Sequence, residues 1–333
     1  GVKGISLFVV PKFLLKEDGT IGDANTLSCI GIEHKLGIHA SPTCTMQFDN
    51  AKGFLVGEAH QGLKYMFTMM NNARLSVGLQ GVGVAERAYQ HAKAYAEERV
   101  QGKDLESGES CTIDHHPDVG RMLSMMDVMT MAGRAMCYQA ALYMDKAKGG
   151  DDAAQAYVEF LTPLVKSWCT DMACEVASIG VQVHGGMGFV EETGAAQYYR
   201  DARILPIYEG TNGIQANDFL FRKIMRDKGK FFTSWISEVV SELQGNEYAK
   251  PSLDLLQDVA QKMAKISDVK RLAYVAVPLL NACALLQAAT LMEKTQIAAV
   301  KAGNKKAEEQ TQFFFKSVFP RNIAFLNEVK NYL

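Results

Sequence analysis

Three long stretches of helical periodicity constrain the fold of this 333-residue chain more than any other feature. Over residues 57–95, apolar side chains recur every three to four positions along one stripe, as in an amphipathic helix. The same period returns from about 116 to 148, and again from Asp151 or Asp152 to Val183. Only the short Gly149-Gly150 turn separates the last two stretches, which predicts that they form antiparallel neighbours in a helical bundle.

Shorter helical patterns fill the C-terminal third of the chain. They predict helices at about 212–226 and 231–243, and one or two more over 251–300 with a bend at Pro278. A last helix should be interrupted near Pro320, because proline cannot donate to the helical ladder.

Before residue 57 the period changes to that of β-strands. Residues 5–10, 26–33 and 43–48 are apolar or alternating runs bounded by turn residues. Three such strands leave an unpaired sheet edge, which proteins rarely expose. The sequence also begins at Gly1 without an initiator methionine, so we expect that an earlier part of the sheet is missing here. We expect the chain expressed alone to dimerise poorly or aggregate.

Composition excludes several classes of protein. A net charge of -2 gives no reason to expect nucleic acid or an anionic membrane as a partner. Seven scattered cysteines contain no CxxC pair, so neither a metal site nor a disulfide framework is predicted, and a reducing compartment is favoured. The longest apolar stretch, residues 272–291, contains Pro278, Asn281 and Gln287, which is typical of a buried helix and not of a membrane span.

The segment Tyr208-Glu209-Gly210-Thr211 is the first candidate for chemistry. It places one carboxylate between an aromatic residue and a glycine, directly before a helical pattern. Either Thr211 or Asn212 can serve as the N-cap of that helix. Glu209 is therefore a candidate buried base, and a loop glutamate that only helps to cap the helix is the alternative.

Two further segments could bind a ligand. Three glycines follow His184 within four residues, more than a helix C-cap needs, and they would allow backbone to lie against a flat or anionic ligand. Arg99 ends the first long helix, and its guanidinium suits paired phosphate oxygens. The alternative for Arg99 is a solvated cation that stabilises the helix C-terminus.

In this order the segments resemble the acyl-CoA dehydrogenase family of flavoproteins, and most closely its longer-chain branch. The matching stretches are Lys35-Leu36-Gly37, Ala40-Ser41, Gly53 to Glu58, Gln61-Gly62, Arg74, Glu98-Arg99, Gln182 to Phe189, Tyr199 to Ala202, and Ile207 to Gln215. They cover the chain from near residue 5 to about 226. The sequence departs from the family pattern after Gly102, where residues 106–115 look inserted.

The resemblance implies a mostly α fold with a small β part and a bound FAD. The expected domains are a partial middle β-domain (1–57), a C-terminal helical bundle carrying the flavin and catalytic motifs (58–226), and a helical C-terminal extension (227–333). By matched position, Arg99 and Gln101 would meet the FAD pyrophosphate, and Thr211 would lie beside the flavin. Gln182, Gly185 and Gly186 would line the adenine side across a homodimer or homotetramer.

The implied reaction is α,β-dehydrogenation of an acyl-CoA thioester, with Glu209 removing the α-proton while a hydride passes from the β-carbon to flavin N5. The implied substrate contacts are Asn71, Asn72, Arg74 and Gly210. In some family members the base instead precedes the matched arginine, but that residue here is Ala73, whose side chain cannot take a proton.

Partners and rivals follow from the same resemblance. An electron-transfer flavoprotein would accept the electrons, and the location would be cytoplasmic, or the mitochondrial matrix in a eukaryote. An acyl-CoA oxidase, which passes electrons to oxygen, shares the implied fold. A non-catalytic helical scaffold of the same fold is the second alternative, and the retained Glu209 and glycine cluster argue against it.

Overall fold

A computed structural model describes residues 1–333 except for the side chains of Val2 and Asn71. The chain divides into two compact units, Gly1–Ala73 and Arg74–Leu333. The boundary falls inside the first long helix, α1 (Gly62–Glu98).

Helices form most of the chain, as predicted. The α-helices are α1 (Gly62–Glu98), α2 (Pro117–Lys148), α3 (Asp152–His184), α4 (Gly186–Phe189), α5 (Ala195–Ala202), α6 (Asn212–Asp218), α7 (Lys230–Leu243), α8 (Lys250–Met263), α9 (Val269–Tyr274), α10 (Ala276–Ala302), α11 (Lys305–Phe313) and α12 (Arg321–Tyr332). Two π-helical segments, η4 (Phe219–Ile224) and η5 (Phe314–Val318), extend α6 and α11, and short 3₁₀ turns are η1 (Val2–Gly4), η2 (Ile113–His115) and η3 (Glu191–Thr193).

The strands are short and pair only in antiparallel twos. In the first unit β1 (Leu7–Val9) pairs with β6 (Phe54–Val56), β2 (Phe13–Leu15) with β3 (Ile21–Ala24), and β4 (Leu27–Ile32) with β5 (Cys44–Phe48). In the second unit β7 (Val100–Lys103) pairs with β8 (Ser110–Thr112). The three predicted strands correspond to β1, β4 and β5, while β2, β3, β6 and the hairpin are too short for a clear period. The hairpin contains much of the stretch that looked inserted after Gly102.

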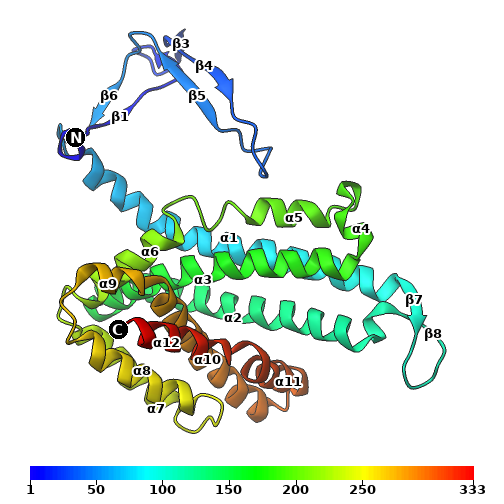
Figure 1. Cartoon of the computed structure of the whole chain (residues 1–333). Coiled ribbons are helices and arrows are strands. Elements are labelled where there is room, and N and C mark those ends of the chain that lie inside the picture. The colour runs from blue at the N-terminus through cyan, green and yellow to red at the C-terminus, as the bar shows by residue number, and fades with distance from the viewer. The chain divides into compact units, whose positions relative to one another are not determined.

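The long helices of the second unit form the expected bundle. Helices α1, α2 and α3 run side by side (Figure 1), and α2 packs extensively against α3. Asp151 caps the start of α3 by accepting a hydrogen bond from the Ala154 amide at 3.0 Å. Gly150, with φ of +94°, completes the turn between the antiparallel pair. The predicted bundle pair is therefore confirmed.

The C-terminal helices correct two expectations. Residues 251–300 form three helices, α8, α9 and α10, where one or two were expected. Pro278 does not bend a helix, because it lies in the first turn of α10, where a missing N–H leaves no ladder bond unmade. The break comes earlier, at Val275, between α9 and α10. The predicted interruption near Pro320 is confirmed, since Pro320 precedes α12.

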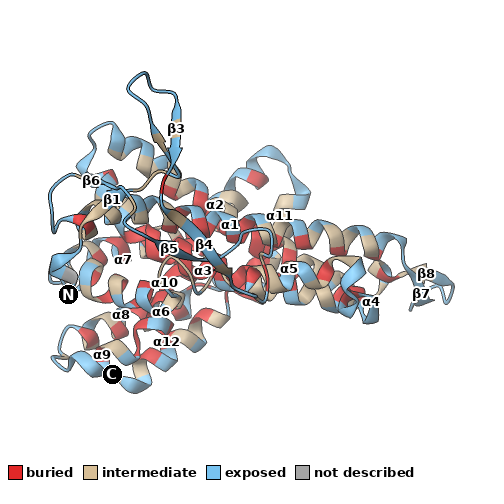
Figure 2. Cartoon of the chain, turned by 90° about the horizontal axis from the view of Figure 1, so that it is seen from above, coloured by how far each residue is buried: buried red, intermediate tan, exposed pale blue. Residues whose placement is uncertain are grey.

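One continuous hydrophobic core holds the second unit together, from Leu75 on α1 to Val329 on α12. Figure 2 shows the buried residues concentrated in these helices. Helix α10 is long and apolar enough to cross a membrane, yet 78% of its most apolar stretch is buried inside the chain, as in a core helix. The C-terminal helices share this core with the bundle, and the domain division at residue 226 stays a prediction.

The first unit is held differently. Among its described side chains none of the hydrophobic ones is buried, and Phe8, Leu15 and Phe48 are exposed. Buried Asn25 ties its loops together: the side-chain amide donates to the Pro11 and Lys52 carbonyls, and its oxygen accepts from the Lys52 amide at 2.9 Å. Hydrogen bonds and strand pairing, more than apolar packing, shape this unit.

Candidate active site

Glu209 lies in a tight loop between α5 and α6. It adopts φ of +55°, a left-handed backbone conformation that is uncommon for residues other than glycine. The loop is closed by hydrogen bonds from the Tyr208 amide to the Ile204 carbonyl at 3.1 Å and from the Asn212 amide to the Pro206 carbonyl at 3.0 Å. Among the described residues, the Glu209 N–H donates to no acceptor. A carboxylate and a free amide are therefore presented by the same residue.

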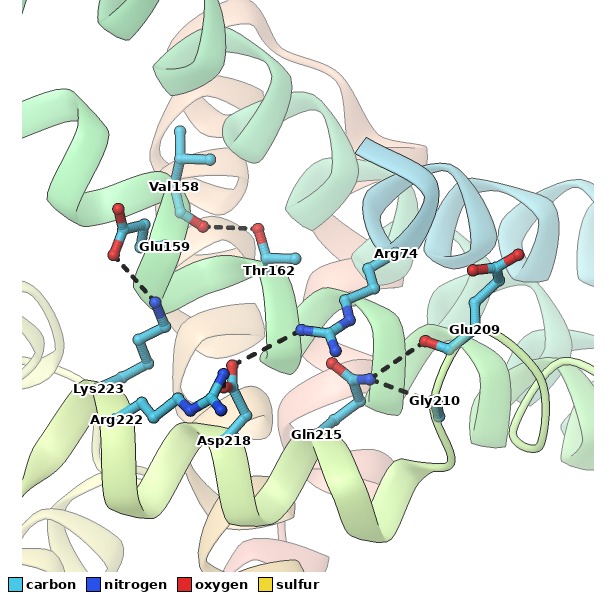
Figure 3. A network of polar contacts seen from close by, with 10 residues as sticks. All are labelled: Arg74, Val158, Glu159, Thr162, Glu209, Gly210, Gln215, Asp218, Arg222 and Lys223. Carbon is cyan, nitrogen blue, oxygen red and sulfur yellow. Dashed lines mark hydrogen bonds and ion pairs between the residues drawn. The ribbon is translucent and has the colours of Figure 1, made fainter. Parts of the chain in front are cut away.

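Gly210 and Gln215 lie on the other side of the turn. Gly210 has φ of +87°, and a Cβ at this position would lie 2.8 Å from Gln215 Nε2. That buried amide donates to the Glu209 and Gly210 carbonyls at 3.5 and 3.3 Å. Figure 3 shows the Glu209 carbonyl directed at Gln215 while its carboxylate points away from this contact. Thr211 is the N-cap of α6 and accepts from the Ile214 amide at 3.3 Å, which decides between the two expected caps.

Arg74 and Tyr208 complete the surroundings of the loop. Arg74 is only 8% exposed and lies beside Gly210, where an added Cβ would be 3.8 Å from its Nη2. Its Nη1 is 3.8 Å from Asp218 Oδ2, and its buried Nε has no partner among the described residues. The Tyr208 hydroxyl donates to Gln80 Oε1 on α1. Burial, and then the Glu209 charge, raises the pKa of Tyr208, which keeps this hydroxyl a donor.

A polar network ties the loop to α3. Lys166 Nζ donates to Asn212 Oδ1 at 2.9 Å, and Asn212 Nδ2 donates to Asp171 Oδ1 at 2.8 Å. Burial lowers the pKa of Lys166 to about 8, Asp171 and Glu209 oppose that shift, and Arg74 adds to it. Burial raises the pKa of Asp171 against the effects of Asn212, Lys166 and Arg203.

A second cluster forms where the C-terminal ends of α1 and α3 meet. His184 is 4% exposed, stacks on Tyr95 at 4.4 Å between ring centroids, and lies 4.6 Å from the His91 ring. Its Nδ1 is 2.7 Å from the Gly180 carbonyl oxygen. His184 is thus a packing residue, and it holds the glycine turn against α1.

The glycines of this turn have different reasons to be glycine. Gly188 has no room for a side chain, because a Cβ would lie 2.2 Å from the Val181 carbonyl oxygen. Gly185 has φ of +58°, which favours glycine for its backbone. Gly186 meets neither constraint, since a Cβ there would have nothing within 4 Å. The fold does not require glycine at position 186, and the space beside it is open. A ligand could therefore approach the backbone closely there.

The candidate cofactor side chains beside this turn are exposed. Arg99, at the end of α1, has no ion-pair partner among the described residues, and Gln182 is exposed on the last turn of α3. The Gln101 carbonyl lies 2.7 Å from His116 Nε2, which fixes the backbone after Arg99. The sequence-predicted cofactor residues other than Thr211 are therefore brought together at one end of the bundle.

The two clusters lie far apart on one helix. Arg74 lies in α1 and Arg99 directly follows its last residue, Glu98, so about 37 Å separates them at 1.5 Å per residue. Glu209, Gly210 and Thr211 belong to the Arg74 end. The predicted substrate residues Asn71 and Asn72 cannot be added to either cluster: the side chain of Asn71 lies outside the described residues, and Asn72 belongs to the first unit.

Sequence reasoning missed the residues that support the loop, Lys166, Asp171, Gln215 and Asp218. One signal was available. Lys166 stands inside residues 160–170, every one of which is buried on α3. A lysine within a fully buried stretch is rare and requires a partner.

The architecture is that of an acyl-CoA dehydrogenase C-terminal domain, and residues 60–222 match the sequence model of that domain. The chain belongs to the acyl-CoA dehydrogenase family. It is 52% identical over 271 residues to a 3-methylmercaptopropionyl-CoA dehydrogenase of Ruegeria pomeroyi, a match that covers 80% of this chain and 46% of that protein. The chain thus spans about half the length of the curated relatives it matches.

Solved structures share the fold at low identity. A Caenorhabditis elegans protein, ACDH-11, solved with C11-CoA, superposes with a TM-score of 0.78 at 22% identity, covering 95% of this chain and 53% of that one. An acyl-CoA dehydrogenase from Bacillus anthracis, complexed with FAD, gives 0.72 at 23% identity, covering 91% and 56%.

Proposed function

We propose that this chain is part of an FAD-dependent acyl-CoA dehydrogenase in which Glu209 is the catalytic base. One observation carries the proposal: a single carboxylate stands in a strained loop whose next residue, Gly210, lies beside the buried guanidinium of Arg74. The resemblance described above assigns the role of base to this carboxylate. A strained backbone conformation persists only where the surrounding contacts hold it in place, and such positions cluster at active sites.

In the proposed reaction, an acyl-CoA thioester is oxidised to its α,β-unsaturated form. Glu209 takes the proton from the α-carbon, and its own free N–H is available to donate to the thioester oxygen as negative charge develops there. Arg74 would orient the loop, because its guanidinium lies beside Gly210. When bound, the flavin supplies the acceptor for the hydride that leaves the β-carbon.

The residues at the far end of α1 fit a dinucleotide. Arg99 is free to contact a pyrophosphate, and Gln101 follows it on the same segment. Gln182, Gly185 and Gly186 offer an exposed amide and open backbone for the adenine side, and Thr211 would meet the flavin at the other end.

The separation of about 37 Å between the two clusters supports a shared cofactor. One FAD molecule is too short to reach both clusters of the same chain. Each FAD would therefore be held by Thr211 of one copy of the chain and by Arg99 and Gly186 of another copy. A homodimer or homotetramer is therefore part of the proposal. An electron-transfer flavoprotein is the proposed acceptor, and the cytoplasm the proposed location.

The decisive test replaces Glu209 by glutamine in the enzyme. This change keeps size and hydrogen bonding but removes basicity, so acyl-CoA should still bind and perturb the flavin spectrum. Anaerobic flavin reduction should slow by about 10²–10⁴-fold, the usual effect of losing a general base. Stopped-flow bleaching against a panel of acyl-CoAs would measure the effect and rank chain lengths, including a thioether substrate.

Glu192→Gln is the matched control, because Glu192 is an exposed glutamate in the short 3₁₀ turn before α5. It should reduce its flavin at the wild-type rate. If Glu209→Gln does so too, the base lies elsewhere. Rapid reoxidation of the reduced enzyme by oxygen would favour the oxidase, and no bleaching by any acyl-CoA in the wild type would favour the scaffold.

A further inference from the structure

Lys166 has no part in the proposed reaction, yet it is fully buried beneath the Glu209 loop. Its neighbours on α3 are apolar or small, and Thr170, one turn on, is also fully buried. Burying an ammonium group is costly unless it is paired and hydrogen-bonded. The only hydrogen-bond partner of the Lys166 ammonium group among the described side chains is Asn212, 46 positions along the chain and three residues after Glu209.

Both the oxygen and the nitrogen of the Asn212 side-chain amide are hydrogen-bonded. Its oxygen accepts from Lys166 Nζ at 2.9 Å. Its nitrogen donates to Asp171 Oδ1 at 2.8 Å, and also meets Thr170 Oγ1 at 3.1 Å and the Ser167 carbonyl at 3.2 Å. A cation on one side and a carboxylate on the other leave the amide one orientation.

The residue held by these side-chain bonds also closes the loop that contains Glu209, through its main chain. The Asn212 main-chain amide bonds the Pro206 carbonyl at 3.0 Å, so the backbone between Pro206 and Asn212 forms one ring. Glu209 lies within that ring at φ of +55°. The Gln215 contacts to the loop carbonyls, at 3.3 and 3.5 Å, are long and hold the turn only weakly.

We infer that Asn212, clamped between Lys166 and Asp171, is the positioning residue that keeps Glu209 in its strained, substrate-facing conformation. The inference rests on the proposed role of Glu209. Lys166 and Asp171 act through Asn212, because each is hydrogen-bonded to the Asn212 amide and they make no direct hydrogen bond to each other. An amide is the group that fits this place: a carboxylate would face Asp171 with like charge, and an apolar side chain would leave both charges unpaired.

Exchange of the acid and the amide tests the clamp. Asn212→Asp places two carboxylates against each other and should open the loop. Adding Asp171→Asn restores one acid and one amide in reversed order, with Lys166 still donating to residue 212. We expect Asn212→Asp to slow flavin reduction at saturating acyl-CoA by about 100-fold, as misplacement of a catalytic group by about 1 Å can. The double variant should recover most of that loss, and Asp171→Asn alone should lose little, because its amide oxygen can still accept from Asn212.

A second readout does not depend on turnover. Hydrogen exchange of the peptide over residues 204–215 should quicken in Asn212→Asp and return toward wild type in the double variant. Asn322→Ala is the matched control, since Asn322 is a buried asparagine whose amide donates to the Ala282 carbonyl at 2.7 Å on other helices. It should destabilise the fold without changing exchange in the loop, the FAD content or the rate.

The outcomes are distinct. Equal rates and equal loop exchange in wild type and Asn212→Asp would overturn the positioning role, and so would a double variant as impaired as the single one. Rate losses in Asn322→Ala that match those in Asn212→Asp would also overturn it, by showing general destabilisation. If wild type fails to reduce its flavin while loop exchange follows the expected order, the clamp stands and the proposed function fails.

Discussion

Gly210→Ala should separate the structural needs of the Glu209 loop from those of the surrounding helices. Gly210 has φ of +87°, and a left-handed conformation costs an L-residue roughly 1–2 kcal/mol. The new Cβ would also lie 2.8 Å from Gln215 Nε2, so this buried amide must move and weaken its bonds to the loop carbonyls. Two such bonds, each long, contribute about 1 kcal/mol together.

The combined cost is therefore about 2–3 kcal/mol if the loop keeps its shape. Urea unfolding should show this loss in the free energy of unfolding, unless the loop relaxes. In that case the strain is relieved by moving Glu209, and flavin reduction by an acyl-CoA should slow by about 10²-fold while stability changes less. Measuring both quantities on the same variant distinguishes the two responses, and either response supports the geometry.

Gly213→Ala is the matched control, three residues further on. Gly213 lies in the first turn of α6, where an added Cβ meets only Thr211 Oγ1 at 3.8 Å, an ordinary contact. Alanine in a helix is favoured over glycine by about 0.5–1 kcal/mol, so this variant should be as stable as wild type or more so. A Gly210→Ala protein as stable and as fast as Gly213→Ala would refute the reasoning about the turn.

Three further predictions concern other parts of the second unit. Arg99→Ala should weaken FAD retention about tenfold to a hundredfold, with little change in the rate of the enzyme that still holds FAD. The control Lys103→Ala should retain FAD as the wild type does. If Arg99→Ala keeps its flavin content after dialysis, Arg99 is only a solvated residue at the helix end. Gly81→Ala should destabilise the bundle by about 1–3 kcal/mol in urea unfolding, because its Cβ would lie 2.5 Å from the Cys169 carbonyl oxygen. A variant as stable as the wild type would show that α1 and α3 can move apart at this contact without cost. Burial lowers the pKa of Lys166 from 10.5 to about 8, so the unfolded chain binds this proton more tightly than the folded chain does. The free energy of unfolding of the wild type, compared with that of Lys166→Met, should therefore rise between about pH 8 and 10.5, by up to roughly 3 kcal/mol. A difference between the two proteins that does not depend on pH would contradict the burial of the charge.

The long helices and the position of the candidate base could be predicted from sequence because both depend on local rules. A 3.6-residue period extends over α2 and α3, and α3 begins at Asp152, one of the two predicted starts. The position of Glu209 and Gly210 directly before a helix was readable from the sequence in the same way. The short strands β2 and β3 were missed, because three or four residues give too few alternations to define a period.

The sequence by itself determined that one helix ends next to Arg99 and that Glu209 precedes another. Only the tertiary structure decided what surrounds Glu209. Lys166 meets Asn212 across 46 positions, and the His184 ring stacks on Tyr95 across 89, because packing of α3 against its neighbours sets these pairs. No local pattern encodes contacts between distant segments, since they arise only when helices bury a common core. The side chains that contact the Glu209 loop are therefore determined by how the helices pack.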